Sequence, residues 1–129
     1  MTRTGVVVVT HGEAAVDMVA AIEAMAGPLA DVRSVSVHAG EERAETERRL
    51  ALAVDELHVD DVLFLVDLEG STPFNLCCRR CTGHSVVLSG MNMPMLLKLS
   101  TTARDVGAEA LAEELLATGK KSIHIRTRG

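Results

Sequence analysis

Short apolar runs alternate with longer amphipathic stretches along most of this chain. Four runs rich in β-branched and other apolar residues predict strands, over residues 6–9, 34–38, 62–66 and 85–89. Between them, apolar residues recur at the three- and four-residue spacing of helices, over 13–26, 41–57, 72–82 and 105–118. A further helix is expected to start at Pro94, because proline is favoured in the first helical turn.

The order of these elements predicts an α/β fold. Four strand-then-helix units favour a three-layer α/β/α arrangement, with a parallel four-stranded sheet between the helices. Residues 6–9 and 62–66 contain no polar side chain, which is typical of strands covered on both faces. A chain of 129 residues has the length of one ordinary domain, so we expect a single domain over 1–129.

The last residues depart from the strand-then-helix pattern. Residues 122–127 alternate isoleucine with polar or charged residues, and no helix follows them. This pattern fits an edge strand, either on the chain's own sheet or exchanged with a second subunit.

Composition and charge exclude several kinds of partner. The chain is 47% hydrophobic and 24% charged, which indicates a globular protein and not a disordered one. Its formal net charge of −5 has the wrong sign for a protein that binds the nucleic-acid backbone. Phe64 and Phe74 are its only aromatic residues, so a stacking surface for bases is excluded as well. We expect no nucleic-acid partner.

The N-terminal segment carries no export or membrane signal. Its apolar run over 6–9 is far too short for a signal-peptide core or a spanning helix. The three cysteines, an odd number, suit a reducing compartment better than a disulfide framework. We therefore expect a cytoplasmic protein without direct membrane insertion.

Two residues with reactive side chains come at predicted strand ends. His11 lies two residues beyond the valine run, and Asp67 directly follows the third strand. In open parallel sheets, ligands bind beyond the carboxyl ends of the strands, where the strand order reverses. If the first and third strands are neighbours, His11 and Asp67 meet there. The aspartate would then fix the imidazole tautomer and make the other ring nitrogen the nucleophile.

The loop after Asp67 predicts an anion site. Gly70, Ser71 and Thr72 lead into a helix N-terminus, where free backbone N–H groups and hydroxyls can hold phosphate oxygens. Thr72 is a suitable N-cap, with Pro73 at the first helical position. A histidine nucleophile, an orienting carboxylate and an anion cradle together describe a phosphoryl acceptor. Polar residues at strand ends are also common without function, so the His11–Asp67 pair alone leaves both interpretations open.

Three blocks of the sequence resemble a known family. They are residues 9–12 (VTHG), 62–75 (VLFLVDLEGSTPFN) and 90–95 (GMNMPM). In content, order and spacing they are similar to the mannose-type (mannose/fructose/sorbose) IIA domain of the bacterial phosphoenolpyruvate:sugar phosphotransferase system (PTS). The resemblance covers essentially the whole chain.

The resemblance implies a cytoplasmic phosphohistidine relay. His11 would accept a phosphoryl group from the phosphocarrier HPr and pass it to a IIB component, with Asp67 as its hydrogen-bonded partner. Gly70, Ser71 and Thr72 would bind the phosphoryl oxygens, and no metal or cofactor is implied. The resemblance also implies a homodimer, in which the C-terminal segment is exchanged as an antiparallel edge strand.

The phosphate loop departs from the family pattern. Many members have a Gly-Gly-Ser-Pro loop, often with tryptophan before it, whereas Glu69 takes the aromatic place here. Thr72 keeps a hydroxyl where the family usually has serine. Glu69 would weaken phosphate binding or alter partner choice if it pointed into the site, and would have neither effect if it pointed to solvent. A regulatory phosphoacceptor or interaction module uncoupled from sugar transport, and the phosphocarrier subunit of a dihydroxyacetone kinase, are the alternative functions.

A cysteine cluster in the third predicted helix offers a further candidate site. Cys77, Cys78 and Cys81, with His84 three residues on, superficially suggest a metal or redox site. The paired C-x-x-C knuckles of zinc sites are absent, which favours small buried helix residues. Arg79 is either solvated or available to an acidic partner, and His38 is the only other histidine expected near the site.

Overall fold

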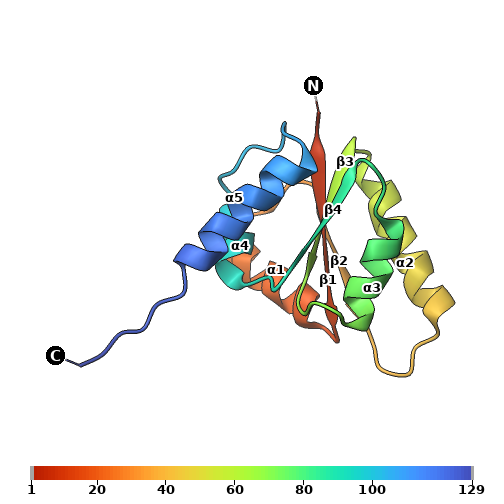
Figure 1. The fold of residues 1–129 in the computed structure, drawn as a ribbon, viewed down its shortest axis with the longest axis horizontal. Coiled ribbons are helices and arrows are strands. Elements are labelled where there is room, and N and C mark those ends of the chain that lie inside the picture. The colour runs from red at the N-terminus through yellow and green to blue at the C-terminus, as the bar shows by residue number, and fades with distance from the viewer. Residues whose placement is uncertain (1, 129) are drawn as a thin grey trace.

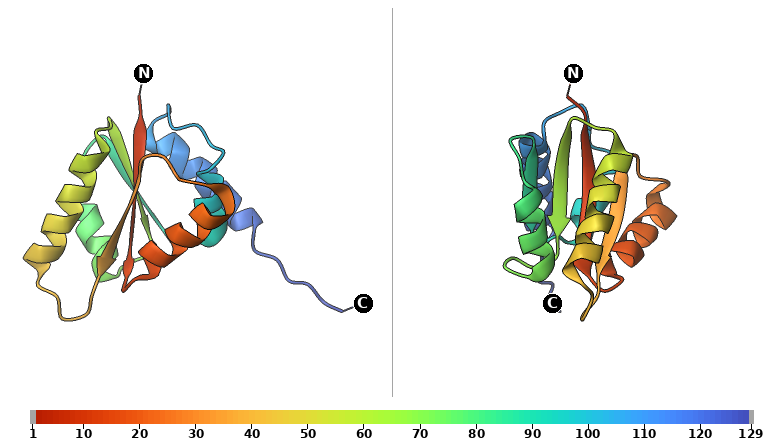
Figure 2. Two further views of the ribbon diagram at one scale, coloured as in Figure 1. Left: turned by 180° about the vertical axis from the view of Figure 1, so that it is seen from behind. Right: turned by 90° about the vertical axis from the view of Figure 1, so that its right-hand side faces the viewer.

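Four parallel strands form the centre of the molecule, with helices on both of their faces (Figures 1 and 2). In this computed structural model residues 2–128 are described; Met1 and Gly129, the ends of the expected domain, lie outside them. The strands are β1 (Thr4–His11), β2 (Val32–Val37), β3 (Asp61–Val66) and β4 (Ser85–Ser89). The helices are α1 (Ala14–Ala26), α2 (Arg43–Leu57), α3 (Thr72–Arg80), α4 (Met93–Lys98) and α5 (Ala108–Lys121).

The sheet has the order β2-β1-β3-β4, and every pair of neighbouring strands is parallel. The predicted three-layer α/β fold is therefore confirmed. The central position of β1 explains its run of valines, since all four have no exposed surface. Successive side chains point to opposite faces, so Val6 and Val8 enter one core while Val7 and Val9 enter the other.

Each face of the sheet has its own apolar core. On one face, α1, α4 and α5 cover the sheet around Leu63 and Leu65 of β3. On the other face, α2 and α3 pack over Val62, Phe64 and Val66. The helices of both layers turn apolar residues at helical spacing toward the sheet. In α2 these residues are Leu50, Ala53 and Leu57, and all three are buried.

The segment 90–95 has a structural role on the face opposite α2 and α3. Asn92 caps α4, because its side-chain oxygen accepts the N–H of Met95 at 3.3 Å. Its Nδ2 donates to the carbonyl of Gly119 in α5 at 3.2 Å. Met91 and Met95 are buried in the core between these helices. This block therefore joins α4 to α5.

The C-terminal segment pairs with no strand of the described chain. After α5, residues 123–128 have no regular secondary structure and run away from the body of the molecule (Figure 1). An edge strand on the chain's own sheet is thus wrong for this structure. Exchange of an antiparallel strand with a second subunit stays a prediction.

Candidate functional site

The strand order brings two predicted site residues to one place. β1 lies between β2 and β3, so the chain leaves β1 toward one side of the sheet and later enters β3 on the other. Val9 of β1 is paired with Val66 of β3, so the carboxyl ends of the two strands are adjacent. His11 ends β1 and Asp67 directly follows β3. These are the positions where ligands bind in open α/β sheets.

Asp67 holds the imidazole of His11 in a defined orientation. His11 Nδ1 lies 2.8 Å from Asp67 Oδ2, and the backbone N–H of His11 donates to the same oxygen at 3.1 Å. The second carboxylate oxygen accepts the N–H of Leu68 at 3.0 Å. With the proton on Nδ1 and bound to Asp67, Nε2 carries the free lone pair. Half of the His11 side chain is exposed, so the ring remains accessible.

The hydrogen bonds from His11 also set the protonation state of the Asp67 carboxyl. Partial burial raises the pKa of Asp67, but the hydrogen bonds from the ring and backbone of His11 outweigh it. The pKa of Asp67 therefore lies below its ordinary value. The carboxylate is ionised at neutral pH, as required of a group that stabilises a cationic imidazole ring.

The predicted anion loop precedes α3. Ser71, and not Thr72 as expected, is the N-cap of α3, and its side-chain oxygen accepts the N–H of Phe74 at 3.4 Å. The Ser71 hydroxyl donates to the carbonyl of Leu68 at 2.6 Å. Gly70 has a φ of 75°, a left-handed conformation that favours glycine. Among the predicted loop residues Gly70, Ser71 and Thr72, Thr72 lines a cleft together with His11.

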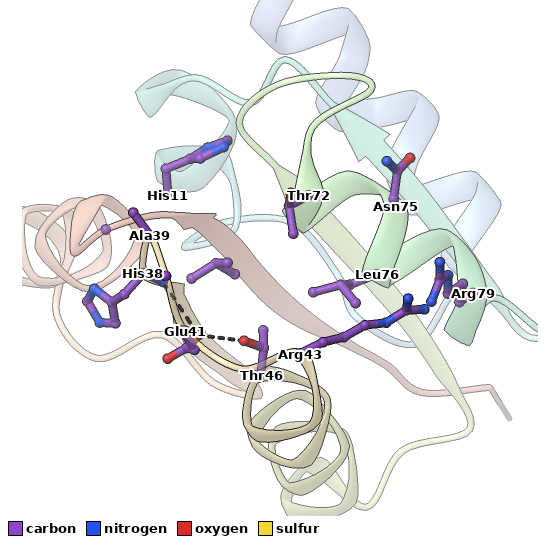
Figure 3. A pocket seen from close by; sticks show the side chains of 13 residues that line it. His11, His38, Ala39, Glu41, Arg43, Thr46, Thr72, Asn75, Leu76 and Arg79 are labelled. Atoms are coloured by element: carbon purple, nitrogen blue, oxygen red, sulfur yellow. Dashed lines mark hydrogen bonds between the residues drawn. The ribbon is translucent and has the colours of Figure 1, made fainter.

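The cleft has a volume of about 630 Å³ and lies between α2, α3 and the end of β1 (Figure 3). His11 and Thr72 border one end of it, and Leu76 lies near its middle (Figure 3). Arg43 of α2 and Arg79 of α3 lie at the end farther from His11 (Figure 3). Both arginines lie near Glu47, with Oε1 2.9 Å from Arg43 Nε and 3.9 Å from Arg79 Nη1.

The sequence did not indicate Arg43 as a cleft residue. It stands in the first turn of α2, and its place at the cleft depends on how α2 and α3 pack against the sheet. His38 does line the cleft, and its Nε2 lies 3.6 Å from Glu13 Oε1. Glu69 is exposed and is absent from the cleft lining, so its charge lies outside the cleft.

The cysteine cluster is divided between the core and the surface. Cys77 is buried beneath α3, whereas Cys78 and Cys81 are exposed, so the expectation of buried residues was correct for Cys77 alone. Burial raises the pKa of the Cys77 thiol to about 12. All three thiols are free. Within residues 2–128, no group of three or more His, Cys, Asp or Glu side chains is arranged to hold a metal ion.

A family model described as the PTS system fructose IIA component matches residues 5–116. The chain belongs to this family. The match includes β1 with His11, β3 with Asp67, and α3 through α4. The chain is therefore a IIA-type component of the mannose class of the sugar phosphotransferase system, in agreement with the resemblance of its three sequence blocks.

Relatives of this IIA component agree with that membership. The mannose-specific EIIAB component of the PTS of Escherichia coli K12 is 32% identical over 123 residues. That alignment covers 92% of this chain but 38% of the relative. The mannose/sorbose-specific IIA subunit from Enterococcus faecalis is 25% identical, with a TM-score of 0.86 and coverage of 98% and 97%. The IIA protein associated with a fucose utilization operon in Streptococcus pneumoniae is 26% identical, with a TM-score of 0.81 and coverage of 96% and 93%.

No helix among the described residues of this IIA component has both the length and the apolar character needed to cross a membrane.

Proposed function

We propose that this protein is a phosphohistidine relay, in which His11 accepts a phosphoryl group from phospho-HPr and transfers it to a IIB component. The observation that supports this most directly is the 2.8 Å contact between His11 Nδ1 and Asp67 Oδ2. It commits one ring nitrogen to the carboxylate and leaves Nε2 as the nucleophile. Membership of a phosphotransferase-system family supports the same chemistry.

The transfer needs no net proton movement on His11. The Nε2 lone pair attacks phosphorus, a nitrogen–phosphorus bond forms, and the bond to the donor breaks with its electron pair returning to the donor. The phosphorylated ring keeps its proton on Nδ1 and is formally cationic. The ionised carboxylate of Asp67 stabilises that charge. Because the proton stays in place, the neutral imidazole is again the leaving group when the phosphoryl group passes to IIB.

The loop before α3 is the proposed cradle for the phosphoryl oxygens. The first backbone N–H groups of a helix lack partners within the helix and attract anions. Thr72 adds a hydroxyl within the cleft that His11 borders. Gly70 and Ser71 give the loop its path into the helix. This local arrangement can hold an anion although the chain as a whole is acidic.

Reconstituted phosphoryl transfer tests the proposal. The chain is incubated with enzyme I, HPr and labelled phosphoenolpyruvate, and label that is acid-labile and alkali-stable is measured. We expect wild-type protein to be labelled and His11→Ala to carry no label. His84→Ala is the matched control, because His84 is exposed, does not line the cleft and should leave labelling intact. Full labelling of the His11→Ala variant would overturn the assignment.

Addition of a IIB component separates a relay from a sensor. A relay loses its label to IIB within the time of a single turnover. Phosphorylated His11 that remains stable in the presence of candidate IIB proteins would contradict onward transfer and favour a regulatory phosphoacceptor. Transfer of the label to the other subunits of a dihydroxyacetone kinase, and not to a sugar-system IIB, would identify the chain as the phosphocarrier subunit of such a kinase.

A further inference from the structure

Arg104 is a buried cation at the opposite edge of the sheet from His11. It lies in the loop between α4 and α5, and its carbonyl accepts the N–H of Thr4, the first residue of β1, at 2.8 Å. Only 5% of Arg104 is exposed. β1 runs for eight residues from Thr4 to His11, which separates the two sites by about 25 Å at the usual rise of a strand.

The guanidinium of Arg104 has few and weak partners. Nη1 donates to the carbonyl of Asp31 and Nη2 to the carbonyl of Leu99, both at the long distance of 3.4 Å. Nε is buried and has no hydrogen-bond partner among the described residues. No carboxylate of the described residues lies within 4.0 Å of the group. A buried charge is costly unless it is paired, so this arrangement lacks the counter-ion that burial of an arginine normally requires.

The nearest candidate counter-ion is already engaged. Asp31 Oδ2 accepts from Arg3 Nε at 2.8 Å and lies 2.6 Å from Arg3 Nη2. Arg3 therefore neutralises Asp31 and leaves Arg104 uncompensated. Burial lowers the pKa of Arg104, the charge of Arg3 lowers it further, and Asp31 opposes both effects. Two guanidinium groups thus lie close together, and Asp31 pairs with only one of them, that of Arg3.

Both arginines line one cavity of about 380 Å³. Thr102 also lines this cavity, and its hydroxyl makes no hydrogen bond with the described residues. Ser100 lines it as well, but its hydroxyl donates to the carbonyl of Leu97. Asp105 also lines the cavity, but it is exposed. The cavity therefore offers a buried cation, a second cation and a free hydroxyl, and it has room for a phosphate group with a small organic body.

We propose that this cavity binds the phosphate group of a small phosphorylated molecule, with Arg104 as its principal ligand and Arg3 and Thr102 as supporting donors. Arginine presents several N–H groups in a planar fork that matches the spacing of phosphate oxygens. A bound phosphate supplies the negative charge that Arg104 lacks. The site is distinct from the phosphoryl-transfer site at His11, and its occupation is measurable without any transfer reaction.

Titration of the wild-type protein with inorganic phosphate, followed by NMR, tests the site directly. The Arg104 Nε–Hε resonance, assigned by its loss in Arg104→Lys, should move saturably when sodium phosphate replaces sodium chloride at constant ionic strength. Sodium acetate at the same ionic strength is the second arm, and it should produce a smaller shift. A phosphate-independent Arg104 resonance, or an equal shift with acetate, would overturn the proposal.

Replacement of the buried Arg104 alters the core as well as the site, so three variants outside the core provide a second test. Thr102→Val should weaken phosphate binding by roughly 10- to 100-fold, because a hydrogen bond to a charged group is lost. Asp105→Asn should tighten binding, because a carboxylate at the cavity is removed. Asp55→Asn is the matched control for net charge, since it makes the same change at an exposed position that does not line the cavity. Equal affinities in all three variants would show that the phosphate is held elsewhere and contradict the assignment.

Discussion

The side chains of His11 and Asp67 share a hydrogen bond of 2.8 Å, and the same carboxylate oxygen accepts the backbone N–H of His11 at 3.1 Å. One oxygen thereby fixes both the ring and the main chain of the residue proposed to carry phosphate. A ring that rotated would lose the direction of Nε2, and a neutral partner would lose the stabilisation of the cationic phosphorylated ring. The proposed relay thus depends on Asp67 for geometry and for charge.

The first prediction concerns this pair. Asp67→Asn should slow phosphorylation of His11 by roughly 10- to 100-fold, which corresponds to the loss of one charge-assisted hydrogen bond of about 1.5–3 kcal/mol. Single-turnover transfer from phospho-HPr gives the rate, and circular dichroism verifies the fold. Asp55→Asn, at an exposed position of α2, is the matched control and should retain the wild-type rate. A wild-type rate in Asp67→Asn would remove Asp67 from the proposed mechanism.

The second prediction follows from the lowered pKa of Asp67. A carboxyl whose pKa is lower in the folded state binds fewer protons there, so it stabilises the fold above its ordinary pKa of 3.8. This contribution disappears as the pH falls through the folded-state pKa. Urea unfolding should therefore show wild type more stable than Asp67→Asn at pH 7, with the difference shrinking below about pH 4. A difference that stayed constant down to pH 2 would contradict an ionised, hydrogen-bonded carboxylate.

The His11–Asp67 pair could be predicted from the sequence because it depends only on where two neighbouring strands end. The apolar runs predict buried strands, and polar residues that end adjacent parallel strands must meet at one edge of the sheet. The inclusion of Arg43 in the cleft could not be predicted in this way, because it depends on how α2 and α3 pack together. Arg104 was also missed, since nothing in a loop sequence shows that a charged residue will be buried. The N-cap of α3 differed by one residue, since Ser71 and Thr72 have equivalent capping chemistry.

The third prediction separates the three cysteines. Iodoacetamide should alkylate Cys78 and Cys81 in the native protein and leave Cys77 unmodified, because Cys77 is buried and its pKa is raised to about 12. Peptide mass spectrometry should show alkylation of Cys77 at least roughly 100-fold slower than that of the other two. In urea, all three should react alike. Rapid native labelling of Cys77 would contradict its place in the core beneath α3.

The fourth prediction concerns the joint between α4 and α5. Asn92→Ala removes the cap of α4 and the bond to the Gly119 carbonyl, so the free energy of unfolding should fall by about 1–2 kcal/mol. Thermal unfolding should show Tm lowered by roughly 5 °C. Asn92→Ser keeps a capping oxygen and should lose about half as much. Asn75→Ala, at an exposed position of α3, is the control, and equal stability of the two alanine variants would contradict the role of Asn92.

The last prediction concerns the C-terminal segment, whose Ile123 and Ile125 are 74% and 94% exposed in the single chain. Alternating isoleucines that point to one face suit a strand that covers apolar surface, so exchange with a second chain would bury them. We expect sedimentation velocity to give a dimer of the 13.7 kDa chain, and the double variant Ile123→Lys/Ile125→Lys to give a monomer. The control double variant His124→Ser/Arg126→Ser changes the opposite face and should remain dimeric. A wild-type monomer, or a dimer unaffected by the lysines, would rule out exchange of this strand as the basis of assembly.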